Sequence, residues 1–259
     1  MLILLPPSEG KTPARRGKPL DLGALSFPEL TAPRQAVLDA LVDLCRRDAE
    51  QARRTLGLPP GLADLVARNA ALLEAPTARA DHVYTGVLYD ALALPALAAE
   101  ARRRATSRVA VVSSVFGLVR PGDRIPAYRL SGDVSLPGLG AVAGVWRREL
   151  DPVVRAAVGG GLVVDLRSTT YAAFWRPAAD LARRVVTVRV LHESGGRRTV
   201  VSHFNKATKG RLVRDLLEDG ANPGSVRALA ATLDRLGWHA EVGPPGRHGT
   251  QVDVVVREV

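Results

Sequence analysis

Leu2-Ile3-Leu4-Leu5 is an uninterrupted apolar run, and it breaks at once into Pro6-Pro7-Ser8-Glu9-Gly10-Lys11-Thr12. A short apolar run that ends in Pro and Gly is typical of a buried strand followed by a loop. The same transition to hydroxyl-bearing and basic residues recurs at residues 113–121, 165–171 and 202–211. Because ligands bind beyond the strand ends of open α/β sheets, the four segments predict one shared site rich in hydroxyls and positive charge.

Strand-like runs and helical repeats alternate along the chain without strict order. Apolar runs predict strands at residues 108–115, 162–166, 185–191, 198–202, 238–242 and 251–256, with Gly195-Gly196 as a hairpin turn. Helical spacing predicts helices at residues 33–57, 87–104, 141–158, 206–218 and 224–236, with a kink or break at Pro152. We therefore expect a mixed α/β (α+β) fold in a single domain of residues 1–259, with a mixed central sheet covered by helices.

The composition is ordinary for a globular protein except for its charge. The 259 residues are 46% hydrophobic and 24% charged, and the formal net charge is +10. Such a charge favours polyanionic partners through counterion release and long-range attraction. A solvated basic surface without a specific ligand remains the alternative, since the excess of Arg over Lys also fits the codon supply of a GC-rich genome.

Several classes of site are disfavoured by the sequence. Cys45 is the only cysteine and lies in a helical stretch, so we expect a buried thiol, no disulfide within the chain and a cytoplasmic location. The first residues lack the basic segment of a signal peptide, and no apolar run approaches the roughly 18 residues that span a membrane. The five histidines are scattered and no Gly-x-Gly-x-x-Gly occurs, so neither a metal nor a dinucleotide cofactor is predicted.

The first loop has part of a phosphate-binding motif. Gly10-Lys11-Thr12 resembles the end of a Walker loop, but Leu5 stands where the first Gly of that motif is required. Lys11 and the amides beside it could hold an anion without that geometry. A solvated lysine explains the spacing at least as well.

Two arginines and two hydroxyl residues are further candidates. Arg120 and Arg129 carry planar guanidinium groups that suit phosphate or carboxylate, although Arg120 could instead pair with Asp123. Ser168 and Thr169 follow a predicted strand, where they would either cap the next helix or serve as a nucleophile or phosphate ligand. The Gly-x-Ser-x-Gly elbow of serine hydrolases is missing.

The last segment concentrates positive charge. Lys206, Lys209, Arg211 and Arg214 lie on the first turns of a predicted helix. Cations at a helix N-terminus oppose the macrodipole, and a bound phosphate would relieve this conflict. A solvated basic face neutralised by nearby acidic residues is an equally good explanation.

Together these motifs resemble the YaaA family of peroxide stress proteins, nearly from end to end. The resemblance rests on the opening Leu2-Ile3-Leu4-Leu5-Pro6-Pro7, on Val83-Tyr84-Thr85-Gly86, on residues 114–121 with Tyr128-Arg129-Leu130, on Trp146, on residues 165–171 and on residues 202–206 with Lys209-Gly210 and Arg211. Each motif is weak alone, but their order and spacing are specific. The resemblance implies a single mixed α/β domain with a basic cleft, a cytoplasmic protein of the hydrogen peroxide response that limits damage linked to free iron, and DNA binding.

The resemblance also implies which residues line the cleft. The anion- or nucleic-acid-binding set is Ser8, Lys11, Arg120, Arg129, Lys206, Lys209 and Arg211, with Ser168 and Thr169 beside them. Ser131-Gly132 and Thr170 stand where many relatives carry acidic residues, and the first loop has the form Ser8-Glu9-Gly10-Lys11. The two missing acids make the cleft more basic and remove any acid/base role that they have in relatives.

Two hypotheses about function follow. The first is a stress protein that binds DNA without reading its sequence, because the aromatic content of 4% leaves little scope for base stacking. The alternative is an enzyme acting on a nucleotide-like or other phosphorylated small molecule. In that enzyme Glu9 would be the base, Lys11 and Lys206 would stabilise charge, and Ser168 or Thr169 would be the nucleophile or a positioning group. The sequence leaves catalysis and the oligomeric state open.

Overall fold

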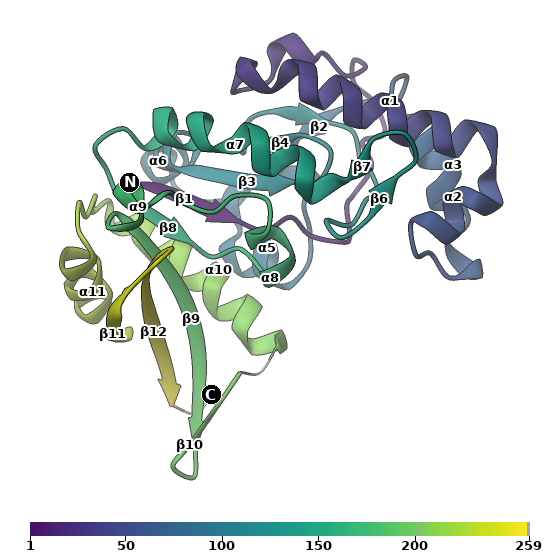
Figure 1. The fold of residues 1–259 in the computed structure, drawn as a ribbon. Helices are drawn as coiled ribbons and strands as arrows, with labels where there is room; N and C mark the ends of the chain where they lie inside the picture. Colours follow the sequence, from purple (N-terminus) through teal and green to yellow (C-terminus); the bar gives the residue numbers. More distant parts are fainter. Residues whose placement is uncertain (201, 258–259) are drawn as a thin grey trace.

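The computed structural model describes residues 1–200 and 202–257. Its centre is an eight-stranded mixed sheet in the order β11-β12-β9-β8-β1-β3-β4, with β10 paired to β9 (Figure 1). These strands are β1 (Leu2–Leu5), β3 (Val109–Ser113), β4 (Gly117–Val119), β8 (Val163–Asp165), β9 (Val185–Ser194), β10 (Arg197–Thr199), β11 (His239–Gly246) and β12 (Gly249–Arg257). Two small sheets pair β2 (Ala78–Arg79) with β5 (Arg124–Ile125) and β6 (Ser135–Leu136) with β7 (Gly140–Ala141). The predicted mixed α/β fold is confirmed.

Helices cover the central sheet on both sides. The α-helices are α1 (Thr31–Arg47), α2 (Ala49–Thr55), α3 (Asp64–Ala70), α4 (Ala80–Val83), α5 (Val87–Leu92), α6 (Ala99–Arg108), α7 (Val142–Val158), α8 (Thr169–Ala172), α9 (Ala179–Ala182), α10 (Ser202–Asp219) and α11 (Val226–Arg235). Short 3-10 helices lie at Leu22–Ala24, Pro28–Leu30, Pro60–Leu62 and Leu94–Ala96. Figure 1 shows α7 on one side of β1 and β3, with α5 and α10 on the other.

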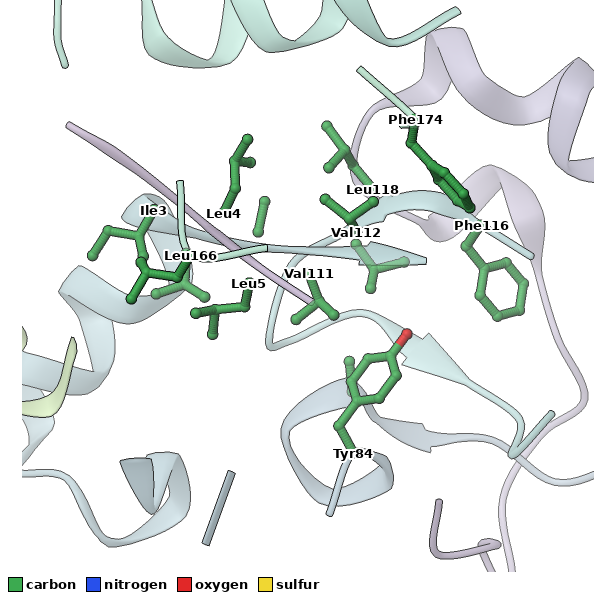
Figure 2. Close-up of a cluster of buried hydrophobic side chains, with 14 of the residues drawn as sticks. Ile3, Leu4, Leu5, Tyr84, Val111, Val112, Phe116, Leu118, Leu166 and Phe174 are labelled. Atoms are coloured by element: carbon green, nitrogen blue, oxygen red, sulfur yellow. The ribbon is translucent and has the colours of Figure 1, made fainter. Parts of the chain in front are cut away.

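The opening apolar run forms β1, which lies at the centre of the sheet. All four of its residues expose at most 1% of their surface. β1 pairs in parallel with β3 and β8, so that Leu4 lies between Ala110 and Asp165. A strand flanked by strands and covered on both faces must be apolar at every position. Figure 2 shows β1 side chains within the cluster that also holds Val111 and Leu166.

The connections of the parallel strands create a crevice beside β1. The strands β12, β9, β8, β1 and β3 run parallel, so their carboxyl ends lie along one edge of the sheet. From β1 the chain continues to β3, whereas from β8, on the other side of β1, it continues to β9. The loops after β1 and β8 therefore leave in opposite directions. Open α/β sheets bind their ligands at this kind of topological switch point.

Some predicted elements differ from the structure. The predicted helix 33–57 is two helices, because Asp48 has an extended backbone and its carboxylate accepts from the amides of Glu50 and Gln51 at the start of α2. Of the kink or break predicted at Pro152, the break does not occur, since α7 continues through this residue. The hairpin of β9 and β10 is confirmed; Val201, which the predicted second strand included, lies outside the described residues.

Two smaller predictions concern Cys45 and the membrane. Cys45 is a free, buried thiol on α1, as expected, and burial raises its pKa to about 11. None of the described helices combines the length and apolar character that crossing a bilayer requires.

Candidate functional site

A pocket of about 370 Å³ opens at the carboxyl ends of β1 and β8, at the switch point of the sheet. This volume is within the range of small-molecule sites. Its residues come from the loop after β1, the start of α5, the segment 129–131, the turn after β8 and α10. They are Pro6, Pro7, Ser8, Glu9, Gly10, Lys11, Thr85, Gly86, Val87, Leu88, Tyr89, Arg129, Leu130, Ser131, Ser168, Thr170, Tyr171 and Lys206, and we call this the β1/β8 pocket.

The pocket brings together most of the predicted site residues. Ser8, Glu9, Lys11, Arg129, Ser168 and Lys206 line it, although they span some 200 positions of the chain. Arg120, Thr169, Lys209 and Arg211 do not line it. The predicted convergence of distant strand ends therefore holds for the first loop, the turn after β8 and α10.

Arg120 takes part in a different set of contacts. Its guanidinium donates to the carbonyl oxygen of Val109 at 3.0 Å and stacks 4.8 Å from the centre of the Phe27 ring. Its backbone amide donates to Oδ2 of Asp123 at 2.8 Å. Burial lowers the pKa of Arg120, with Asp123 acting in the opposite sense. These contacts hold the turn after β4 and place the guanidinium outside the pocket.

The charge conflict predicted at the start of α10 does not arise. α10 begins at Ser202, four residues before the predicted start at 206. Lys206 consequently lies in the second turn and the other cations farther on. The macrodipole acts mainly within the first turn. The structure thus removes this argument for a bound phosphate.

The basic side chains of α10 also have different surroundings from one another. Lys206 lines the β1/β8 pocket and is exposed. Nζ of Lys209 donates to the carbonyl oxygen of Leu166 at 3.1 Å, which ties α10 to the end of β8. Arg211 is exposed, and Arg214 pairs with a glutamate one turn later. Only Lys206 among them is placed to meet a ligand in the pocket.

Lys11 is the most enclosed cation of the pocket. Its Nζ donates to the carbonyl oxygen of Ser8 at 2.6 Å and lies 4.2 Å from the centre of the Tyr128 ring. Its backbone forms an isolated antiparallel bridge with Tyr84, which fixes the loop after β1. Desolvation, aided by the positive charge of Arg129, lowers the pKa of Lys11 to about 7. Both forms of this amine are therefore present near neutral pH.

Buried hydroxyl groups lie beneath Lys11. The hydroxyl of Tyr128 is 3.1 Å from that of Tyr84 and 2.8 Å from Oγ of Ser113. Ser113 also accepts from the amide of Phe116, at the end of β3. Burial raises the pKa of both tyrosines, so they remain neutral and present their ring faces to the Lys11 ammonium.

Glu9 and Arg129 form an ion pair at the mouth of the pocket. Oε2 of Glu9 lies 2.9 Å from Nη2 of Arg129, and their side chains are 77% and 22% exposed. The side chain of Asn69 bonds to the amide and the carbonyl oxygen of Arg129, which fixes its backbone. An ion pair in contact with water contributes little. Arg129 can therefore exchange Glu9 for the anionic group of a ligand.

The hydroxyl residues of the pocket divide into two kinds. Oγ of Ser8 donates to the carbonyl oxygen of Gly10 at 2.5 Å and accepts from the amide of Thr85 at 3.1 Å, so it stabilises the loop. Ser168 occupies the cap position of α8, but its side chain makes no capping bond. Ser168 and Thr170 are exposed and line the pocket, which leaves their hydroxyls available to a ligand.

Several pocket residues were not assigned to the site from the sequence. Thr85 and Gly86 belong to a motif that carries the family resemblance, which was a usable signal. Tyr171 likewise ends the motif 165–171 that carries the resemblance. Tyr89 had no such signal; it donates to the carbonyl oxygen of Pro6 at 2.6 Å from an ordinary amphipathic helix. Ser131 also lines the pocket. In the described part of the chain, no group of three His, Cys, Asp or Glu side chains gathers closely enough to hold a metal ion.

Comparison with known proteins agrees with these motifs. The family model described as peroxide stress protein YaaA matches residues 1–241. A UPF0246 protein of Streptomyces coelicolor is 52% identical over 100% of both chains, and one of Corynebacterium efficiens is 44% identical over 98% of this chain and 100% of its own. An uncharacterized protein of Campylobacter jejuni is 25% identical over 82% of this chain and 83% of its own. The resemblance noted in the sequence is thereby confirmed, and the chain belongs to the family of the peroxide stress protein YaaA.

Proposed function

We propose that this protein acts in the response to peroxide stress by binding DNA through the cations of the β1/β8 pocket. The name of the family supports the role in peroxide stress. DNA binding is supported by one observation above all: Lys11, Arg129 and Lys206 come from three distant segments and line one pocket, in a chain with a formal net charge of +10. Cations that surround a hollow concentrate their field on it, which attracts phosphate more strongly than scattered charges do.

The three cations are suited to different contacts. Lys206 is exposed, and Arg129 lines the same pocket in an ion pair with Glu9 that is open to water. These two groups would contact backbone phosphates, which position nucleic acid without reading sequence. Lys11 lies deeper and would meet only a group that enters the pocket.

We expect Lys206→Ala to weaken DNA binding in a salt-dependent way. For the unchanged protein the logarithm of the affinity should fall linearly with the logarithm of the salt concentration. Loss of one phosphate contact should reduce that slope by about 1 and weaken binding to all sequences alike. Fluorescence anisotropy with labelled duplex and bulged DNA, from low to physiological salt, measures both quantities.

Lys18→Ala is the matched control for that experiment. Lys18 is exposed and lies outside the pocket, so its removal changes the net charge by the same amount. We expect it to leave the slope nearly unchanged. An affinity that does not vary with salt, or equal losses in the two variants, would contradict DNA binding at the pocket.

The dimensions of the pocket favour a second candidate, an enzyme acting on a nucleotide-like or other phosphorylated small molecule. A volume of about 370 Å³ suits a mononucleotide and is far too small for a duplex. Ser168 and Thr170 would supply hydroxyls there. Glu9, the predicted base, would first have to break its ion pair with Arg129 before it could accept a proton.

Thermal unfolding with added ligands separates the two candidates. A mononucleotide at about 100 times its Kd should raise the free energy of unfolding by about 2.7 kcal/mol. In a chain of this size, each kcal/mol of added stability raises Tm by roughly 2–4 °C. Lys206→Ala should diminish the rise and Lys18→Ala should not. The enzyme candidate fails if millimolar mononucleotides and sugar phosphates leave Tm unchanged while DNA raises it.

A further inference from the structure

Lysine is rare in this chain and gathers at one place. There are four lysines among 36 basic residues: Lys11, Lys18, Lys206 and Lys209. Two of the four line the β1/β8 pocket, and Lys209 donates to Leu166 directly after β8. Arginine keeps its charge at every accessible pH, whereas lysine can release a proton and act as an amine. The chain thus uses lysine at the pocket, where a releasable proton can matter, and arginine almost everywhere else.

Burial and the charge of Arg129 favour the neutral amine of Lys11, whereas Glu9 and the ring faces of Tyr84 and Tyr128 favour the ammonium. Glu9 is the acidic residue among the described residues that line the pocket. Its carboxylate forms an ion pair with Arg129. Nζ of Lys11 donates to the carbonyl oxygen of Ser8 at 2.6 Å, a hydrogen bond that a neutral amine can also donate. Desolvation lowers the pKa of Lys11 to about 7, so the neutral amine is present near neutral pH. A neutral lysine beside a cavity is a nucleophile for carbonyl compounds.

We propose that the ε-amine of Lys11 forms a reversible covalent imine with an aldehyde that also carries a phosphate or carboxylate. The lone pair of Nζ attacks the carbonyl carbon, and the electron pair of the C=O bond moves to oxygen, which takes a proton. Nitrogen returns one proton to water, giving a neutral carbinolamine. The hydroxyl group then leaves with a proton as water, nitrogen gives up its remaining hydrogen, and the C=N bond forms. One amine and one aldehyde thus yield one imine and one water.

The anionic group of the ligand follows from the other cations. Arg129 and Lys206 line the same pocket as Lys11, so an aldehyde that bears a phosphate or carboxylate can place its anion on them while its carbonyl meets Nζ. The pocket has the volume for such a molecule. This chemistry does not depend on DNA binding, and a protein that fails to bind DNA could still form the imine.

Pyridoxal 5′-phosphate, which carries both an aldehyde and a phosphate, is the probe that tests this inference. The protein is incubated with a limiting amount of the probe, imines are reduced with borohydride, and labelled lysines are identified by peptide mass spectrometry. We expect the label on Lys11 in at least tenfold excess over the exposed Lys18, and we expect the labelled fraction to rise as the pH passes through about 7. The α-amine of Met1 and Lys209, whose pKa values burial also lowers, are scored separately by their peptides.

Two variants and a second probe complete the test. Lys11→Arg keeps the charge but removes the nucleophile, so it should abolish labelling at position 11 and leave Lys18 unchanged. Lys206→Arg should preserve labelling of Lys11. Pyridoxal, which lacks the phosphate, should label Lys11 several-fold less. Equal labelling of the four lysines, or an excess on Lys18, would overturn the inference even if Lys11→Arg does not fold; equal labelling by the two probes would overturn the requirement for an anion.

Discussion

Gly210→Ala is expected to destabilise the protein by about 2 kcal/mol, although alanine is the better helix former. Gly210 lies in α10 where that helix meets α5. A Cβ at this position would overlap the carbonyl oxygen of Leu88 and lie only 2.9 Å from Cβ of Ala91. The overlap is with backbone, so no side-chain rotation can relieve it and the helices must separate. Overpacking of this kind costs up to about 3 kcal/mol, against a gain of about 1 kcal/mol in helix propensity.

The contact between Gly210 and Leu88 lies close to residues that line the β1/β8 pocket. Lys206 lies one turn before Gly210 on α10, whereas Leu88 and Tyr89 are on α5. All three residues line the pocket. If the two helices separate, Lys206 on α10 moves away from Leu88 and Tyr89 on α5. We therefore expect Gly210→Ala to weaken ligand binding as well as stability.

Gly144→Ala provides the matched control, because it places the same methyl group in another helix. At Gly144, in α7, the nearest atoms to a new Cβ are 4.0 Å away. The substitution should therefore stabilise the protein by about 1 kcal/mol through helix propensity alone. Urea denaturation of both variants measures the two effects. If stability changes in the same direction in both variants, close packing of α10 on α5 does not determine the effect of Gly210→Ala.

The sequence predicts those parts of the fold and site that depend on local patterns. β1 is recognisable because its apolar run and the Pro-Pro break that ends it are adjacent. Lys11 and Ser168 could be assigned to one site because both follow strands, and the carboxyl ends of parallel strands share one edge of a sheet. The hairpin of β9 and β10 follows from its two glycines, which adopt positive φ.

Residues whose role depends on tertiary contacts could not be assigned in this way. Arg120 and Arg129 both follow apolar or turn residues, yet of the two only Arg129 lines the pocket. The guanidinium of Arg120 instead donates to the Val109 carbonyl oxygen and stacks on the Phe27 ring. The net charge of the chain likewise does not show where each charged residue lies in the structure. Arg34 counts toward the charge of +10, but it is fully buried and its guanidinium donates to carbonyl oxygens of the chain.

Asp165→Ala should cause a larger loss of stability, about 3–5 kcal/mol, because it leaves a buried cation without its partner. Asp165 is the last residue of β8, and its two carboxylate oxygens accept from Nε and Nη2 of Arg167 at 2.8 and 2.6 Å. The side chains of Arg167 and Asp165 are only 2% and 9% exposed. Arg167 also donates to the carbonyl oxygens of Tyr171 and Trp175, which holds the turn containing Ser168. The ion pair therefore fixes one wall of the β1/β8 pocket.

Two comparison variants identify the source of that loss. Asp180→Ala removes an equally well-formed bidentate pair with Arg155 in which Asp180 is exposed. It should have a much smaller effect, because Arg155 keeps its ion pair with Asp151 and remains in contact with water. The double variant Asp165→Leu/Arg167→Met removes both buried charges and should recover most of the stability in urea denaturation. If it stays as unstable as Asp165→Ala, the stability comes from the bonds of Arg167 to Tyr171 and Trp175 rather than from charge compensation. The turn after β8 would then be held by these two carbonyl contacts, and the carboxylate would serve only to orient the guanidinium.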